Sequence, residues 1–198
     1  MNRTLRLCFI VWILLILFAL TACSSNGLKD SLNYEVKEFE FTNQDQEIVR
    51  LEDLKGKIWV ADFIFTSCET VCPPMTAHMT ELQQKVSDEG IEAEFISFSV
   101  DPEIDTPIKL KQFAENYDLT FDNWNFLTGY TQDEIEKYAL DSFKQIVQKP
   151  KSEDQVIHQT LFYLVDQNGT VVKDYSGVEN TPYDQIIEDM KTLQKPSK

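Results

Sequence analysis

The sequence has few basic residues, few histidines and few cysteines. Its 198 residues include 18 Lys and Arg against 33 Asp and Glu, which gives a formal net charge of -15. Because nucleic-acid binding needs clustered Lys and Arg, this balance argues against a nucleic-acid partner. The charge suits a soluble domain that meets cationic partners or metal ions, and a well-solvated acidic surface explains it equally well. The chain also lacks internal repeats and any sign of a second domain.

The N-terminus has the pattern of an export signal. Arg3 and Arg6 precede a nearly unbroken apolar run over residues 8–20. A basic start, an apolar stretch and small residues at a cleavage point are typical of secretory signals. The apolar run is short for a membrane span, which needs about 20 residues. Residues 1–22 are therefore predicted to be a signal peptide, and an uncleaved membrane anchor is the alternative.

The signal ends in Leu20-Thr21-Ala22-Cys23, which resembles the bacterial lipobox. In signals of that kind the Cys carries lipid on its sulfur and becomes the new N-terminus. Cys23 is therefore the predicted lipid attachment site, and residues 23–37 are the predicted linker. Both interpretations place the domain, residues 38–198, outside the cytoplasm and tethered to the membrane. The lipoprotein interpretation places it on the outer face of the bacterial cytoplasmic membrane.

Only two of the four cysteines are expected in the folded domain, Cys68 and Cys72. In an exported protein such a pair can form a structural disulfide. A disulfide across so short a loop constrains the unfolded chain little, so it would stabilise the fold poorly. The pair is therefore predicted to be functional.

The pattern along the chain predicts an α/β domain. Residues 58–65 are apolar except for Asp62, which indicates a strand buried on both faces and a carboxylate that needs a partner. Residues 51–57 are predicted to be a polar turn. Further strands are expected over residues 39–41, 47–50, 93–100, 124–127, 160–165 and 171–175, and helices over residues 73–87, 106–117, 133–140 and 181–193. A hairpin, then βαβα, then ββα predicts a mixed central sheet flanked by helices, the order that a thioredoxin-like fold requires.

Cys68 and Cys72 lie between a buried strand and the start of a helix. Backbone N–H groups and the positive end of the helix dipole lower a thiol pKa there and favour thiolate. If the pair is one helical turn apart, the two Cβ atoms are about 5–6 Å from each other, farther than the ~3.5–4.5 Å of a relaxed disulfide. Two metal–sulfur bonds of about 2.3 Å can bridge that gap. The loop therefore accommodates a metal easily and a disulfide with local adjustment.

A nearby imidazole would complete a site suited to copper or zinc. His78 is six residues beyond Cys72 on the predicted helix, about 240° around its axis, and is predicted to be an exposed residue that points away. His158 stands in a loop just before the strand over residues 160–165. It can reach both cysteines if the strands are neighbours, and a solvated loop His is the alternative.

Other side chains near this end of the sheet are weaker candidates. Met75 and Met79 carry thioethers that suit Cu(I), but their spacing on an apolar helix face favours core positions. Asp101 ends a strand on the side of the cysteine loop, where it can support the metal site or simply shape the turn into Pro102. Glu69, between the cysteines, can tune the local charge or be solvated.

At these residues the chain resembles the SCO/SenC family of copper proteins, which help assemble cytochrome c oxidase. Residues 65–73, Phe-Thr-Ser-Cys-Glu-Thr-Val-Cys-Pro, are similar to that family's Cys-x3-Cys-Pro signature. Residues 99–107 are similar to its Asp-Pro-x-x-Asp-Thr-Pro segment, and residues 127–129 match a further short element. His158 lies where the family carries its metal-binding His, although Gln159 and its other neighbours differ from the Val-Asp-His-Thr of many members. The resemblance spans about residues 38–190.

The resemblance implies a thioredoxin-like fold in which Cys68, Cys72 and His158 hold copper as Cu(I) and Cu(II). The implied function is that of a metallochaperone for the dinuclear copper centre of cytochrome c oxidase subunit II. A metallochaperone passes metal on without turnover, so enzyme activity is not implied. The implied partners are that subunit, with other copper chaperones or thiol–disulfide oxidoreductases.

Two other functions stay open. A thiol–disulfide reductase would use Cys68 and Cys72 to keep the copper-ligand cysteines of the oxidase reduced, and His158 would then be secondary. A peroxidase-like thiol enzyme would need one highly reactive thiolate, often with a separate resolving Cys. The close pair and the Pro73-Pro74 sequence that follows it argue mildly against the peroxidase.

Overall fold

A six-stranded mixed sheet forms the centre of the computed structural model, which describes residues 28–150 and 155–195. The strand order is β1-β8-β7-β4-β5-β6, and β2 and β3 form a separate hairpin. The strands are β1 (Tyr34–Glu35), β2 (Glu40–Thr42), β3 (Ile48–Arg50), β4 (Ile58–Ile64), β5 (Ala93–Ser99), β6 (Trp124–Leu127), β7 (Leu161–Val165) and β8 (Thr170–Ser176). The helices are α2 (Leu51–Leu54), α3 (Cys72–Asp88), α4 (Pro107–Ala114), α5 (Gln132–Phe143) and α6 (Tyr183–Gln194).

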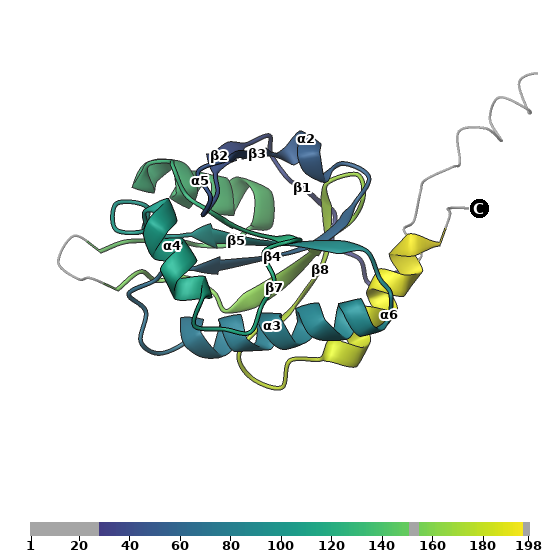
Figure 1. Cartoon of the computed structure of the whole chain (residues 1–198). Helices are drawn as coiled ribbons and strands as arrows, with labels where there is room; N and C mark the ends of the chain where they lie inside the picture. The colour runs from purple at the N-terminus through teal and green to yellow at the C-terminus, as the bar shows by residue number, and fades with distance from the viewer. Residues whose placement is uncertain (1–27, 151–154, 196–198) are drawn as a thin grey trace, which may run out of the picture.

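Helices cover both faces of this sheet. Figure 1 shows α3 and α6 together below it, and α5 with the β2–β3 hairpin above it. Strands β4, β5 and β6 are parallel, whereas β7 is antiparallel to β4 and β8 to β7. The predicted mixed central sheet, flanked by helices and preceded by a hairpin, is confirmed.

Strand β4 lies in the middle of the core, as its apolar sequence predicts. All seven of its residues are buried, including Asp62. The ring of Phe63 stacks on Phe98 of β5 with centroids 5.3 Å apart, and Phe143 of α5 packs edge-on against it at 5.2 Å. Because a close-packed interior tolerates little movement, the end of β4 at Ile64 holds the start of the following loop in a fixed position.

Local capping explains where two helices begin, at positions that differ from the sequence prediction. Residues 51–57 were expected to be a turn, but their first half is α2, which begins where the Arg50 backbone N–H donates to Asp53 Oδ2 at 2.8 Å. Helix α5 extends further in both directions than residues 133–140. Its N-terminus carries a capping box in which Thr131 and Glu134 bond reciprocally.

The linker predicted for residues 23–37 is wrong in its last part. Tyr34 and Glu35 form β1, which pairs antiparallel with Val171 and Thr170 of β8. A strand of two residues has no alternating pattern from which it could be predicted. This part of the predicted linker therefore belongs to the central sheet.

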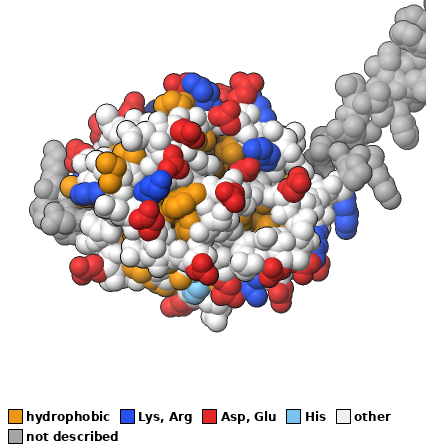
Figure 2. Space-filling view, in the orientation of Figure 1, with side chains coloured by type: hydrophobic (Ala, Val, Ile, Leu, Met, Phe, Trp, Pro, Cys, Tyr) orange, Lys and Arg blue, Asp and Glu red, His pale blue; other side chains and the backbone are white. Residues whose placement is uncertain are grey.

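The predicted signal peptide and Cys23 lie outside the described residues, so cleavage and lipid attachment stay predictions. Within residues 28–150 and 155–195, no helix is long and apolar enough to cross a membrane. On the face shown in Figure 2, acidic and basic side chains are interspersed. That pattern is typical of a well-solvated acidic surface.

Candidate functional site

The cysteine loop follows directly from β4. Residues 65–71 lead from that strand into α3, whose first residue is Cys72. Pro73 and Pro74 come next, at positions where a missing N–H costs no intrahelical bond. Both Cys68 and Cys72 are buried and are free thiols. The predicted placement of the pair between a buried strand and a helix start is confirmed.

The pKa values of the two cysteine thiols are shifted in opposite directions. The pKa of Cys68 is lowered to about 4, first by a hydrogen bond from the Cys72 thiol and then by backbone N–H groups of Cys72, Thr70 and Val71. The Cys72 N–H lies 3.4 Å from Cys68 Sγ. The same thiol hydrogen bond, together with burial, raises the pKa of Cys72 far above its usual range. Cys68 is therefore a thiolate at neutral pH, and Cys72 keeps its proton.

His158 lies beside Cys72 because β7, which it precedes, pairs with β4. Its Nδ1–H donates to the Gln159 carbonyl at 2.9 Å, which leaves Nε2 as an acceptor. Nε2 lies 3.8 Å from Cys72 Sγ, and the ring packs edge-on against Phe65. Burial lowers the pKa of His158, so the imidazole is neutral at pH 7 and available to a metal.

The candidate donor atoms suit copper chemically, and one pair of them also has a suitable spacing. Two sulfurs and a neutral imidazole are the ligands that copper and zinc prefer. Bonds of about 2.3 Å to sulfur and about 2.0 Å to nitrogen, at an open angle, hold those atoms on the order of 3.6 Å apart. The contact between Cys72 Sγ and His158 Nε2, at 3.8 Å, is close to this spacing. The described part of the chain contains no group of three His, Cys, Asp or Glu side chains already arranged to hold a metal ion, so the spacing fits for this one pair of donor atoms.

His78 is not part of this site, as predicted, but the prediction that it is exposed is wrong. It is half-buried, and its Nδ1–H donates to the Gly177 carbonyl at 2.9 Å, with Thr181 Oγ1 at 3.3 Å. The ring also packs edge-on against Tyr183. His78 therefore joins α3 to the segment that leads into α6.

The structure shows one of the two roles predicted for Asp101, shaping a turn, and its support of a metal site stays a prediction. This residue is buried, and its carbonyl accepts the N–H groups of Ile104 and Asp105, which shapes the turn after β5. The carboxylate accepts from Lys149 Nζ at 2.7 Å. This ion pair was not predicted, because Lys149 lies 48 residues further along the chain.

The sequence analysis also missed Asp105, which holds the cysteine loop. Its carboxylate accepts the Thr66 hydroxyl at 2.5 Å, the Thr66 N–H at 3.2 Å and the Ser99 hydroxyl at 2.6 Å. Burial is the main cause of the raised pKa of Asp105. Its place in the Asp-Thr-Pro segment is the signal that could have indicated a structural role.

The burial of the remaining candidate side chains distinguishes core residues from exposed ones. Met75 and Met79 are fully buried on the inner face of α3, so their prediction as core residues is confirmed. Glu69 is exposed. Asp62 is fully buried, and neither carboxylate oxygen makes a hydrogen bond, although the Ser97 hydroxyl is close enough to moderate its pKa. Burial raises that pKa to about 7.

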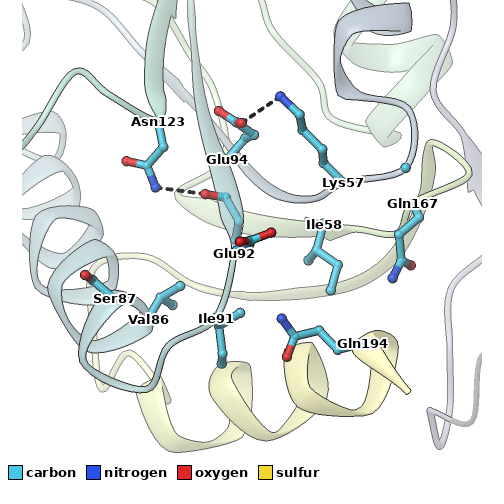
Figure 3. A pocket seen from close by; sticks show the side chains of 12 residues that line it. Lys57, Ile58, Val86, Ser87, Ile91, Glu92, Glu94, Asn123, Gln167 and Gln194 are labelled. Atoms are coloured by element: carbon cyan, nitrogen blue, oxygen red, sulfur yellow. Dashed lines mark hydrogen bonds and ion pairs between the residues drawn. The ribbon is translucent and has the colours of Figure 1, made fainter. Parts of the chain in front are cut away.

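A cavity of about 720 Å³ lies at the other end of the sheet, where β4 and β5 begin. Figure 3 shows two interactions within its lining: Lys57 pairs with Glu94, and Asn123 donates to a backbone carbonyl. The cavity contains neither Cys nor His. The chemistry of the cysteine loop is therefore separate from it.

Comparison with protein families and curated sequences gives consistent matches. The family model described as SCO1/SenC matches residues 29–195. The SCO1 protein homolog of Bacillus subtilis (strain 168) is 64% identical over 178 residues, which cover 90% of this chain and 92% of that protein.

Solved structures give the same result. A SCO1/SenC family lipoprotein from Bacillus anthracis is 51% identical, with a TM-score of 0.83 over 85% of this chain and all of that chain. BsSco is described as having a disulfide switch and as a member of the Sco family of cytochrome c oxidase assembly proteins. It is 66% identical, with a TM-score of 0.79 over 84% of this chain and 96% of that chain. Copper-bound ScoI of Bradyrhizobium japonicum is 26% identical, with a TM-score of 0.66 over 80% of this chain and 99% of that chain. These overlaps confirm the predicted fold class.

Proposed function

Because the chain belongs to the SCO1/SenC family, we propose that it is a copper-binding assembly protein of cytochrome c oxidase. The observation that carries this proposal is the approach of His158 Nε2 to Cys72 Sγ at 3.8 Å, beside a Cys68 sulfur held as thiolate. A neutral imidazole and a thiolate are ready to bind metal without first losing a proton.

We assign the copper ligands to Cys68, Cys72 and His158. Copper is bound in the related ScoI of Bradyrhizobium japonicum, and the donor set here suits both oxidation states. Two sulfurs are soft ligands that favour Cu(I), and the added imidazole nitrogen favours Cu(II). Copper is the cargo of this site, so the protein acts as a metallochaperone and not through turnover.

The proposed recipient is subunit II of cytochrome c oxidase, at its dinuclear copper centre. BsSco is described as a member of a family of oxidase assembly proteins, which supports this choice. Other copper chaperones or thiol–disulfide oxidoreductases are proposed as the sources of metal and electrons.

Oxidase assembly at limiting copper tests this function. Cells that lack this chain are expected to lose most cytochrome c oxidase activity, and the wild-type chain restores it, whereas the Cys68→Ser, Cys72→Ser double variant does not. Excess copper in the medium should partly restore activity without the chain, because it replaces delivery. Full oxidase activity in the deletion strain at limiting copper would contradict the proposal.

The second candidate function is thiol–disulfide reduction of the copper-ligand cysteines of the oxidase. The disulfide switch described for BsSco and the pairing of a Cys68 thiolate with a protonated Cys72 favour it. An added thiol reductant would then restore oxidase activity in the deletion strain, and added copper would not.

We propose that the protein is anchored outside the cytoplasm through lipid on Cys23, and the related Bacillus anthracis protein is described as a lipoprotein. The Cys23→Ser variant is expected to move from the membrane to the soluble extracytoplasmic fraction, because a serine hydroxyl does not replace the lipidated sulfur. Fractionation followed by immunoblotting measures the shift. Complete retention in the membrane would instead indicate that residues 1–22 form an uncleaved membrane anchor.

A further inference from the structure

Both loops of the proposed copper site are fixed to one turn, residues 101–105, which follows β5. On one side Asp105 binds Thr66, two residues before Cys68, through three contacts of 2.5–3.3 Å. On the other side Asp101 binds Lys149 Nζ at 2.7 Å. The turn therefore connects the segment that carries the thiols to the segment that leads to His158.

The ion pair between Lys149 and Asp101 is shielded from solvent. The side chain of Lys149 is 20% exposed and that of Asp101 is 2% exposed. It is the one ion pair of the described residues in which neither side chain is more than one-fifth exposed. Shielded pairs are weakly screened by salt, and removal of one partner leaves an uncompensated buried charge. Glu103, at 3.2 Å, adds a second carboxylate to the same ammonium group.

A short backbone ladder connects Lys149 to His158. The neighbours of these two residues, Gln148 and Ile157, exchange both backbone hydrogen bonds at 3.0 and 2.9 Å. The Lys149 N–H also donates to Glu136 of α5 at 3.0 Å. Displacement of Lys149 would therefore move the backbone that adjoins the imidazole. Figure 1 shows the turn after β5 and these segments at the same end of the sheet.

We propose that Lys149 is a positioning residue for His158: its ion pair with Asp101 fixes the Gln148–Ile157 ladder against turn 101–105 and so sets the spacing between the imidazole and the two cysteine sulfurs. The copper part of this inference rests on the proposed function. The metal-free part does not, because it concerns contacts within the chain alone.

The first test uses metal-free, reduced protein and amide hydrogen exchange. In Lys149→Met, which keeps the aliphatic stem and removes the charge, the amides of Gln148 and Ile157 are expected to exchange at least about tenfold faster, since their protection reports local opening. The amides of β4 should be unchanged, and Lys149→Arg should restore protection. Lys137→Met is the matched control, because Lys137 forms an exposed ion pair with Asp141 on α5.

The variant Asp101→Asn breaks the same ion pair from the other side and gives a second test if Lys149→Met does not fold. Faster exchange at Gln148 and Ile157 in either variant supports the proposal. Exchange equal to wild type in a folded variant would overturn it.

The second test is a Cu(II) titration of Lys149→Met, His158→Ala and the double variant. Loss of a residue that orients a metal ligand typically lowers affinity about 10–100-fold, and that loss is expected for Lys149→Met. The double variant should bind no more weakly than His158→Ala, because Lys149 acts through the imidazole. Fully additive losses would overturn the positioning role. Failure of the wild-type protein to bind copper would contradict the proposed function, whereas unchanged amide exchange would contradict the role of Lys149.

Discussion

Replacement of His158 by alanine is expected to lower the affinity for Cu(II) by more than the roughly 10–100-fold that loss of an outer partner of a metal ligand costs. The variant removes the one nitrogen donor of the set and leaves two sulfurs, which suit Cu(I) better than Cu(II). Cu(I) affinity should therefore fall less. The fold should persist, because the one short hydrogen bond of the His158 side chain goes to the carbonyl of its own neighbour, Gln159, and the contact with Cys72 Sγ is longer, at 3.8 Å.

The measurement is a copper titration of residues 28–198 with all thiols reduced, followed by absorption and electron paramagnetic resonance. Wild type should bind one Cu(II) with sulfur-to-copper charge-transfer bands, and these bands should be weakened or absent in His158→Ala. His78→Ala is the matched control, since His78 bonds to the Gly177 carbonyl away from the proposed ligands. Near-native Cu(II) affinity in His158→Ala would remove this residue from the ligand set and favour the reductase.

Replacement of Asp62 by asparagine is expected to stabilise the reduced protein at pH 8 and to change its stability little at pH 4. Burial raises the pKa of this carboxyl from 3.8 to about 7, so the folded state binds its proton more tightly than the unfolded state does. Stability is therefore highest below the unfolded pKa, falls as pH rises toward 7, and stays low above it. A pKa change of one unit corresponds to about 1.36 kcal/mol, so ionisation of Asp62 lowers the free energy of unfolding by on the order of 4 kcal/mol.

Urea unfolding of wild type and Asp62→Asn between pH 4 and pH 9 measures this difference. The curve of the variant should be flatter over the range from pH 4 to pH 7. Asp118→Asn, at an exposed position, is the control for loss of one negative charge. Parallel pH dependence in wild type and Asp62→Asn would contradict the raised pKa. Because the Asp62 charge contributes to the raised pKa of Cys72, the variant should also ionise that thiol more easily.

The junction of β4 and α3 could be predicted because each of its signals is local. An apolar run ends, two cysteines follow, Pro73 and Pro74 lie in the first turn of a helix, and Gly90 stands just past its end in the left-handed conformation at φ +66°. The approach of His158 to Cys72 could be anticipated only through the order of the strands and the family resemblance. Spacing alone left a solvated loop His as an equal alternative.

The supports of the site could not be predicted, because they join residues far apart in the chain. Asp105 and Thr66 are 39 residues apart, and Lys149 and Asp101 are 48 residues apart. His78 is a third such case, since its hydrogen bond goes to the Gly177 carbonyl, 99 residues away. Local periodicity carries no information on such pairs, and a polar residue in a loop has the same pattern whether it is solvated or paired.

The pairing of β1 with β8 determines how the domain would bear a pull from the membrane. A tether on the N-terminal side loads Tyr34 and its neighbours first, where Leu32 and Val36 donate backbone hydrogen bonds to Val172 and Gly169 at 2.8 and 2.9 Å. Two strands, β8 and β7, separate this edge from β4 and its cysteine loop. Tension would thus act on the hydrogen bonds of a sheet edge, two strands away from the ligands in the cysteine loop.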